Sequence, residues 1–308
     1  MTNVLRRFLA FALSLVGLAG LSQPALAAEC LLGAPGTTQR IAVGDTGRSM
    51  EIHVPVGVER VRDLPLVFLL HGSGGTGAAM LESSGLAATS DHHGFLLAAP
   101  DAGIPVERGF VWNIPGVPTI TGEIPTADDA DDVAFFAATI DWLAEQGCID
   151  RERVYATGLS GGGRMTSWLG CVASDRFAAI APVVGLRAGN PLAADPRRHD
   201  PATCTPEEAM PVYAFAGATD TVNPVEGGGA GYWQYPMDAA LARWAELGDC
   251  QVEPETIAVS ITIAERRYAH CRDDARVIGR VVEGRGHEWV ADNEAMWYFF
   301  WRYRRYRR

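Results

Sequence analysis

The residues with the clearest chemical potential surround Ser160, within residues 158–162 (GLSGG). A short β-branched segment precedes this motif and a helical pattern follows it, as in strand-to-helix turns that expose a serine hydroxyl at a sheet edge. Glycine on both sides relieves the steric clashes of such a strained turn. We therefore predict that Ser160 is a nucleophile. A phosphate-binding loop is the alternative interpretation, but a Walker loop requires lysine and this chain has none.

A serine hydroxyl becomes a good nucleophile only when a neighbouring base accepts its proton. The histidines that follow Ser160 in the sequence are His199, His270 and His287. His287 lies in a glycine-rich segment after the last expected strand, where a loop can carry its imidazole over the sheet edge. His270 adjoins a cysteine and His199 lies among charged residues. We predict His287 as the base.

A triad of this kind also needs a carboxylate that orients the imidazole and stabilises its charged form. In chain order this acid stands between the serine and the histidine. Asp220 lies in the loop after an expected strand that ends at residue 216. We predict Asp220 as the acid, with Glu226 and Asp238 as alternatives.

Two backbone N–H groups are needed to stabilise the oxyanion that forms when a serine attacks a carbonyl group. The residue after the nucleophile, Gly161, supplies one of them in this type of turn. Residues 71–75 (HGSGG) follow an expected strand, and the Ser73 N–H is the predicted second donor. His71 is interpreted as a structural residue that forms a hydrogen bond within this loop.

Short apolar segments rich in β-branched residues alternate with longer helical patterns along the chain. Strands are expected at residues 51–56, 66–70, 95–99, 154–157, 179–184, 212–216 and 277–282. Helices are expected at residues 77–92, 131–146, 162–172, 236–247 and 293–303. This alternation is typical of a mostly parallel sheet with helices on both faces. We predict an α/β-hydrolase fold without a large lid domain, with its site at the carboxyl edge of the sheet.

The first residues have the pattern of an export signal. Arg6 and Arg7 precede an apolar run at residues 8–21 and small residues at 25–27. The run is shorter than the roughly 20 residues that a membrane-spanning helix needs. We predict a cleaved signal peptide at residues 1–27 and a single catalytic domain at residues 28–308. The mature protein is then expected to be secreted or periplasmic.

The net charge of −11 and the isoelectric point near 5.1 argue against nucleic acids and anionic membranes as partners. The arginine-rich segment 302–308 is interpreted as a solvated chain end rather than a binding patch. The absence of lysine excludes Schiff-base chemistry, and no metal or organic cofactor is implied. We expect a monomer.

Six cysteines in an exported chain indicate disulfides. None of them occurs in a CxxC pair or with the spacing of zinc ligands. Sequence alone does not fix their pairing. Proximity favours Cys250 with Cys271, and a bridge from Cys171 to Cys204 would join the helix after Ser160 to the next long loop.

Four segments of the chain form a recognisable set. They are the HGSGG loop, the pair Trp112–Asn113 with the later DDV at 131–133, the runs RVYATGLSGGG and ASDRFAAIAPVVG, and the closing GRGHEW. Together they resemble the feruloyl and acetyl-xylan carbohydrate esterases and their poly(3-hydroxybutyrate) depolymerase relatives, within the α/β-hydrolase superfamily. The resemblance implies a triad and an oxyanion hole at the residues named above.

The resemblance also implies Trp112 and Trp289 as walls of an acyl pocket, although two core tryptophans are the equal alternative. The chain departs from the family pattern at Arg285, where relatives usually have glycine, and at Val290 and Ala291, which replace proline and glycine. These positions border the pocket. The reaction type is therefore better indicated than the substrate.

The residues and the resemblance together predict ester hydrolysis through an acyl-enzyme. The expected substrates are feruloyl or acetyl esters of polysaccharides, or hydroxyalkanoate polyesters and their oligomers. An acyltransferase with the same triad is an alternative, as is a binding protein that has kept the fold without the chemistry. A peptidase is also possible, but we find no propeller or lid segment to select peptides.

Overall fold

The computed structural model describes residues 30, 32–231, 233–251 and 253–305. The predicted signal peptide lies outside the described residues, as do residues 306–308 of the arginine-rich segment. In the described part, ten strands form one sheet in the order β1-β2-β4-β3-β7-β8-β11-β14-β13-β12. They are β1 (Thr38–Ala42), β2 (Ser49–His53), β3 (Leu64–Leu70), β4 (Leu96–Pro100), β7 (Ile149–Leu159), β8 (Ala179–Val183), β11 (Val212–Gly217), β12 (Glu255–Ser260), β13 (Ile263–Tyr268) and β14 (Val277–Val282).

The centre of the sheet is parallel and its edges are antiparallel. Strands β4, β3, β7, β8, β11 and β14 run in one direction, whereas β2 and β13 pair antiparallel with the outer strands of this group. Every residue of β4, β8 and β11 is buried. Strands that are covered on both faces have continuous apolar sequences, which is why these strands can be predicted. The predicted mostly parallel sheet is confirmed.

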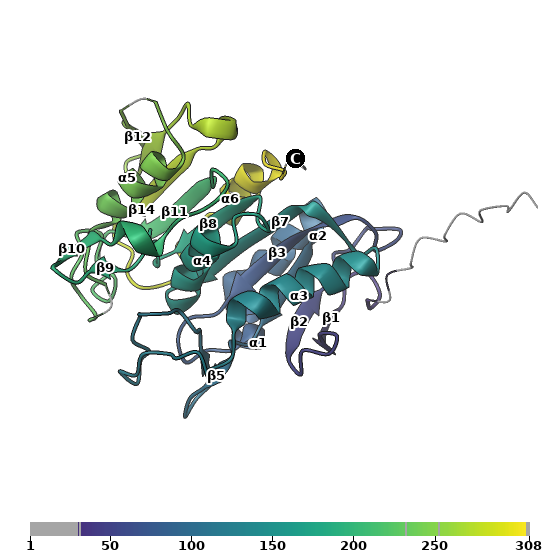
Figure 1. Cartoon of the computed structure of the whole chain (residues 1–308). Coiled ribbons are helices and arrows are strands. Elements are labelled where there is room, and N and C mark those ends of the chain that lie inside the picture. Colours follow the sequence, from purple (N-terminus) through teal and green to yellow (C-terminus); the bar gives the residue numbers. More distant parts are fainter. Residues whose placement is uncertain (1–29, 31, 232, 252, 306–308) are drawn as a thin grey trace, which may run out of the picture.

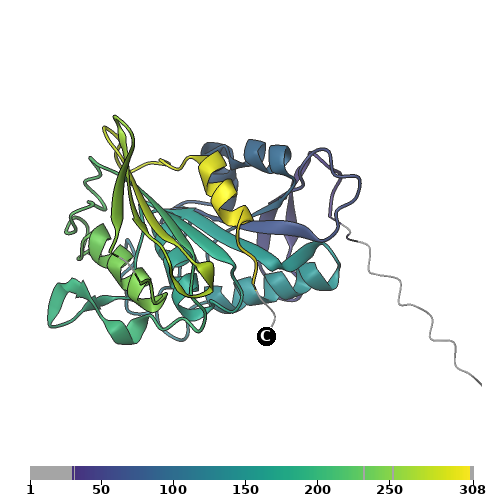
Figure 2. The ribbon, with the colours of Figure 1, turned by 90° about the horizontal axis from the view of Figure 1, so that it is seen from above.

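Six α-helices among the described residues cover both faces of the sheet (Figures 1 and 2). They are α1 (Gly77–Ser84), α2 (Leu86–His93), α3 (Asp132–Glu145), α4 (Gly161–Val172), α5 (Met237–Leu247) and α6 (Asn293–Trp301). Helices α3, α4 and α5 bury residues such as Phe136, Leu169 and Trp244 against one face. Helices α1, α2 and α6 bury residues such as Leu86 and Phe300 against the other. None of the described helices is long and apolar enough to cross a bilayer.

The differences from the predicted elements have local causes. The helix expected at 77–92 is two helices, because Gly85 adopts a positive φ of 67° and ends α1. Strands β1, β12 and β13 have no counterpart among the predicted strands. In β12 five of six residues are exposed, so this edge strand lacks the continuous apolar run of the central ones.

The long loops after β4 and β8 contain short ribbons. Strand β5 (Ile104–Pro105) pairs with β6 (Phe110–Val111), and β9 (Pro191–Leu192) pairs with β10 (Asp195–His199). Both loops leave the carboxyl edge of the parallel strands. In open α/β sheets this edge is where ligands bind.

Three disulfides are present, and they join Cys30 to Cys148, Cys171 to Cys204, and Cys250 to Cys271. Both pairings expected from the sequence are confirmed. Cys171 lies near the end of α4, so its bridge connects the helix after Ser160 to the segment that leads into β11. Three disulfides are consistent with an oxidising compartment.

We expect the disulfides to differ in their contribution to stability. The Cys30–Cys148 bridge spans 118 residues and the Cys250–Cys271 bridge spans 21. Because a longer closed loop restricts the unfolded chain more, Cys30→Ala/Cys148→Ala should lose about 1.5 kcal/mol more unfolding free energy than Cys250→Ala/Cys271→Ala. Urea unfolding of both variants measures this difference. An equal or smaller loss for the longer loop contradicts the expectation.

Candidate active site

Ser160 lies at the turn between β7 and α4, and its backbone conformation is strained. Its φ is 54° and its ψ is −110°, a region that residues with a Cβ rarely occupy. Such a conformation persists only where the surrounding structure enforces it. One enforcing contact is the Ser160 N–H, which donates to the Val183 carbonyl at the end of β8 (2.9 Å).

Close backbone packing explains the glycines around Ser160. A Cβ on Gly158 would lie 2.7 Å from the Gly162 carbonyl oxygen, and a Cβ on Gly162 would lie 2.2 Å from that of Leu70. Both distances are far below van der Waals contact. Side chains at these positions would force the turn away from β3.

Three side chains from separate segments form one hydrogen-bonded chain. His287 Nε2 lies 2.8 Å from Ser160 Oγ, and His287 Nδ1 lies 2.8 Å from Asp220 Oδ2. An ionised carboxylate can only accept, so Nδ1 carries the imidazole proton and Nε2 accepts from the Ser160 hydroxyl. Asp220 follows β11 and His287 follows β14, so all three meet at the carboxyl edge of the parallel strands.

Asp220 is buried, and its own turn holds it in place. Its Oδ1 accepts hydrogen bonds from the N–H groups of Val222 and Asn223, each at 2.8 Å, while Oδ2 faces His287. The Asn223 side chain in turn donates to the Val184 carbonyl next to β8 (2.5 Å). This turn fixes the carboxylate relative to the sheet.

The alternative acids have other surroundings. Asp238 lies on α5 and forms an ion pair with Arg266. The backbone carbonyl of Glu226 accepts a hydrogen bond from Arg197. Among the described hydrogen bonds of His287, the carboxylate partner is Asp220.

The loop that carries His287 is fastened to the loop that carries Asp220. The Arg285 carbonyl accepts hydrogen bonds from both the N–H and the hydroxyl of Thr219, at 2.9 Å and 2.8 Å. A Cβ on Gly217 would lie 2.4 Å from this carbonyl oxygen, so the close approach requires glycine at the end of β11. The relative position of acid and base therefore depends on backbone contacts.

The predicted oxyanion donors are adjacent. A Cβ on Gly161 would lie 2.9 Å from the Ser73 backbone nitrogen, so the two residues are in close contact. Gly161 is the first residue of α4, and helix geometry leaves its N–H without a partner inside the helix. The Arg164 guanidinium donates to Ser73 Oγ at 3.2 Å and so restrains the loop.

His71 holds this loop in place, and its imidazole ring is neutral. The Ala102 N–H donates to His71 Nε2 (3.0 Å), so the ring proton is on Nδ1, which donates to the Gly72 carbonyl (2.8 Å). Burial lowers the pKa of His71, in agreement with a neutral ring. The interpretation of His71 as a structural residue matches these contacts.

The two tryptophans of the predicted acyl pocket have different surroundings. Trp112 is buried, donates to the His71 carbonyl (2.8 Å) and lines a cavity together with Ser73 and Gly161. Trp289 is half-buried against the core, and its indole N–H donates to Asn293 at the start of α6 (2.9 Å). Trp112 thus combines a core role with a position beside the oxyanion donors. The role of Trp289 stays a prediction.

The departures from the family pattern leave the site backbone intact. The Arg285 side chain is half exposed and pairs with Glu288 (2.7 Å). Val290 is buried in the core on the α6 side, and Ala291 packs against the same core.

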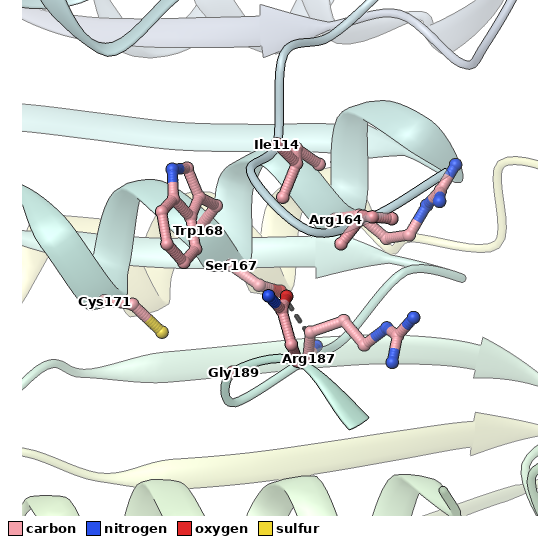
Figure 3. Close-up of a pocket in the computed structure, with 9 residues that line it drawn as sticks. Ile114, Arg164, Ser167, Trp168, Cys171, Arg187 and Gly189 are labelled. Atoms are coloured by element: carbon pink, nitrogen blue, oxygen red, sulfur yellow. Dashed lines mark hydrogen bonds between the residues drawn. The ribbon is translucent and has the colours of Figure 1, made fainter. Parts of the chain in front are cut away.

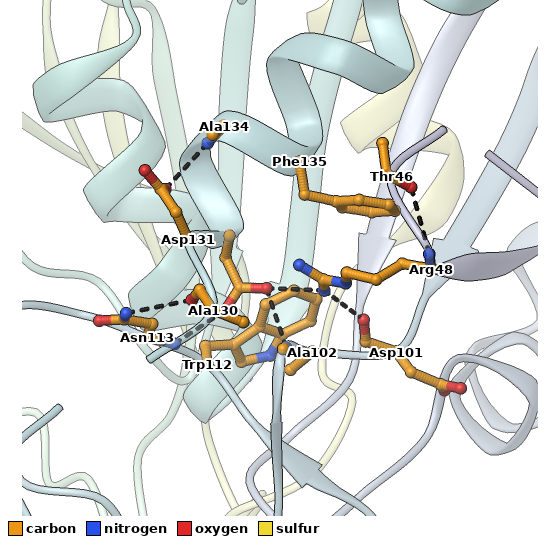
Figure 4. A network of polar contacts seen from close by, with 12 residues as sticks. Thr46, Arg48, Asp101, Ala102, Trp112, Asn113, Ala130, Asp131, Ala134 and Phe135 are labelled. Carbon is orange, nitrogen blue, oxygen red and sulfur yellow. Dashed lines mark hydrogen bonds and ion pairs between the residues drawn. The ribbon is translucent and has the colours of Figure 1, made fainter. Parts of the chain in front are cut away.

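One buried carboxylate anchors the loop between β4 and α3 that carries Trp112 (Figure 4). Asp132 Oδ1 accepts from Arg48 (2.7 Å) and from the Gly103 N–H (2.9 Å), and Oδ2 accepts from the Asn113 N–H (2.8 Å). Burial raises the pKa of Asp132, while the Arg48 charge opposes this effect. The start and the middle of the loop are therefore tied to the start of α3.

Two cavities share part of their walls, and the first of them lies next to the predicted oxyanion donors. The first is lined by Ser73, Trp112 and Gly161 among others. The second lies between α4 and the loop after β8 (Figure 3). Arg164 lines both cavities, and Arg187 lines the second.

Sequence reasoning missed Arg164 and Arg187. A signal was available for Arg164, because it is a charged residue one turn after Ser160 in a helix that is otherwise apolar or small. Arg187 lies in the loop after β8, at the same sheet edge. Nothing in its sequence neighbourhood separates it from an exposed arginine.

Among the described residues, one group of metal-ligand type comes together away from this site. The ligand atoms of His92, His93 and Glu294 lie within 4.8 Å of one another, between α2 and α6. His93 Nε2 and Glu294 Oε2 already form a hydrogen bond of 2.7 Å. This group shares no residue with the Ser160 site.

Comparisons with known proteins point to esterases. The model of the prolyl oligopeptidase family matches residues 125–188, which include β7, Ser160 and α4. Feruloyl esterase B of Piromyces equi is 27% identical over 82% of this chain and 44% of its own length. The putative esterase NocK of Nocardia uniformis subsp. tsuyamanensis is 28% identical over 82% of this chain and 74% of its own length. Poly(3-hydroxyalkanoate) depolymerase C of Paucimonas lemoignei is 34% identical over 43% of this chain and 30% of its own length.

A solved structure shows the same fold. The acetyl xylan esterase of Aspergillus awamori superposes with a TM-score of 0.61 at 17% identity, over 86% of this chain and 99% of that chain. The chain therefore shares the fold of this structure, and the relatives found by sequence carry the names of esterases. The resemblance seen in its motifs is thereby confirmed. This chain spans less than half the length of the Piromyces equi enzyme.

We expect His71 to make the stability of the esterase depend on pH. Burial lowers its pKa in the folded state, whereas the unfolded chain binds a proton near pH 6.5. Below that pH the unfolded state therefore holds more protons, and the free energy of unfolding falls as the pH decreases. Urea midpoints between about pH 8 and about pH 5 measure this loss. If His71→Gln shows the same loss as the wild type, His71 is not its source.

Proposed function

We propose that this esterase hydrolyses carboxylic esters in two steps, through an acyl-enzyme on Ser160. In the first step Ser160 Oγ attacks the ester carbonyl while His287 accepts the hydroxyl proton. His287 then donates this proton to the leaving alcohol. In the second step His287 accepts a proton from water as the water attacks the acyl carbonyl, and it then donates this proton to Ser160 Oγ as the bond to the acyl group breaks and the acid is released.

Asp220 and the two N–H groups supply the electrostatic part of this mechanism. Asp220 holds the imidazole in the tautomer that can accept at Nε2, and it stabilises the imidazolium formed during the attack. The N–H groups of Ser73 and Gly161 donate to the negatively charged oxygen of the tetrahedral intermediate.

One observation carries this proposal, namely the hydrogen-bonded chain from Ser160 through His287 to Asp220. Both of its links measure 2.8 Å. The strained φ of Ser160 supports it, since strain of this kind accumulates at functional turns. The names of the relatives support an ester as substrate.

The substrate class follows from the relatives. We propose feruloyl or acetyl esters of polysaccharides, or hydroxyalkanoate polyesters and their oligomers, with water as the acyl acceptor. We also propose that the esterase is exported by its signal peptide and works as a monomer outside the cytoplasm. Its three disulfides support this location.

Ser160→Ala should abolish hydrolysis of 4-nitrophenyl butyrate, because the variant cannot form the acyl-enzyme. We expect kcat/KM to fall by at least about 10⁴-fold while the circular dichroism spectrum stays unchanged. A fluorophosphonate should label Ser160 in the wild type and leave the variant unlabelled, as measured by peptide mass spectrometry. Retention of more than a few per cent of activity would remove Ser160 from the mechanism.

Adding a primary alcohol to the same assay tests whether water is the preferred acyl acceptor. For a hydrolase, the free acid stays the main product. If the new ester dominates at modest alcohol concentrations, the enzyme is an acyltransferase.

Gly217→Ala should impair catalysis through backbone displacement, because the new Cβ would lie 2.4 Å from the carbonyl oxygens of Arg285 and Gly286. We expect the loop of His287 to move and kcat to fall at least about tenfold. Gly286→Ala is the matched control in the same loop, since its Cβ would meet only the Thr219 carbonyl oxygen at 4.0 Å. Equal activity in the two variants would contradict the role of this contact.

A further inference from the structure

The cavity of Figure 3 contains two buried arginines. Arg164 and Arg187 are only 5% and 6% exposed, and both line this cavity. Ile114, Val117 and Trp168 provide apolar parts of its wall. A hollow with an apolar lining and two cationic groups is suited to a ligand with a hydrocarbon part and an anionic end.

This cavity adjoins the cavity at the predicted oxyanion hole. Arg164, Ile114 and Val117 line both cavities, and Ser73 and Gly161 line the neighbouring one. Arg164 also donates to Ser73 Oγ at 3.2 Å. The path considered for a group attached to the ester carbonyl runs from the predicted oxyanion donors along Arg164 to the second cavity.

The two guanidinium groups come from different elements but belong to residues that line the same cavity. Arg164 lies in the first turn of α4, and Arg187 lies in the loop after β8. Figure 3 shows their side chains extending toward the same side of the cavity. The Arg187 guanidinium lies over the rings of Trp233 and Tyr235, with its central carbon 5.6 Å and 5.1 Å from the ring centroids. This stacking holds the plane of the group and its N–H donors in a defined direction.

We propose that Arg164 and Arg187 bind a carboxylate on the acyl half of the ester substrate. The proposal rests on the proposed function and specifies its substrate class as monoesters of dicarboxylic acids. A guanidinium matches a carboxylate with two parallel N–H···O bonds. Arginine is rarely buried to this extent, and Arg164 contacts Ser73 at the predicted oxyanion hole, in a chain whose net charge is −11.

The position of His287 assigns the carboxylate to the acyl half. The leaving oxygen receives its proton from His287 Nε2, so the alcohol half lies on the side of the imidazole. In the described part of the chain, the oxyanion donors line the first cavity, whereas His287 lines neither cavity. The acyl chain is therefore the half that reaches the arginines.

Matched esters test this assignment. Monomethyl adipate and methyl hexanoate differ only by a carboxylate in place of the terminal methyl group. For the wild-type enzyme at low salt, we expect kcat/KM to be about tenfold or more higher for monomethyl adipate, and this ratio to fall as salt is added. A ratio of one or less overturns the proposal.

A second pair places the carboxylate on the alcohol half. For 4-acetoxybenzoate and 4-acetoxybenzamide we expect similar values of kcat/KM. A preference for the anion confined to this second pair overturns the assignment to the acyl half.

Variants of Arg187 connect the preference to the cavity. Arg187→Met keeps a long side chain against the aromatic rings but removes the charge, and we expect the adipate-to-hexanoate ratio to fall about tenfold. Arg187→Lys should restore part of the ratio. The ratio is independent of the fraction of folded enzyme, because both esters are measured on the same preparation. An unchanged ratio in Arg187→Met overturns the proposal.

Failure of this inference differs from failure of the proposed function. If the wild type hydrolyses both esters of the first pair at similar rates, only the carboxylate site is wrong. If it hydrolyses no ester of either pair, the proposed function itself is wrong.

Discussion

The strained turn at Ser160 is the constraint on which the rest of the site depends. Its φ of 54° is held because the ends of β3, β7 and β8 crowd the start of α4 so closely that side chains are excluded around it. A Cβ on Gly185 would lie 2.5 Å from the Ser160 carbonyl oxygen. A Cβ on Gly162 would likewise lie too close to the Leu70 carbonyl oxygen at the end of β3. The energy of the strain is supplied by the packing of a fully buried parallel sheet. A looser sheet would let the turn relax and withdraw the hydroxyl from His287.

Buried polar groups hold the neighbouring loops in fixed positions. Neutral His71 joins the loop of Ser73 to the end of β4, and the Asp132 carboxylate joins the loop of Trp112 to α3. Such groups are stable inside a protein only when their hydrogen bonds are satisfied. Each of them therefore permits essentially one loop geometry, and the site keeps its shape although most of its walls are loops.

The same loops carry the two arginines of the proposed carboxylate site. Arg164 follows the turn of Ser160 by one helical turn, so the element that raises the hydroxyl also places a positive charge beside the oxyanion donors. Arg187 approaches from the loop after β8, where the rings of Trp233 and Tyr235 hold it. The proposed mechanism and the proposed substrate preference therefore depend on different parts of the fold. The mechanism depends on the turn of Ser160, and the preference depends on Arg164 and on the loop of Arg187.

The sequence by itself determined the parallel core and the residues of the hydrogen-bonded chain. Fully buried strands such as β8 and β11 have continuous apolar runs, and GxSxG, Asp220 and His287 stand in the order that this fold requires. Edge strands such as β12 were not predicted, because exposed strands lack a continuous apolar run. Only the tertiary structure decided which loops meet, since the contact of Arg285 with Thr219 and the convergence of Arg164 with Arg187 join segments far apart in sequence. A local pattern reports how a segment buries its own side chains, and it does not specify backbone contacts or side-chain pairs of this kind between distant segments.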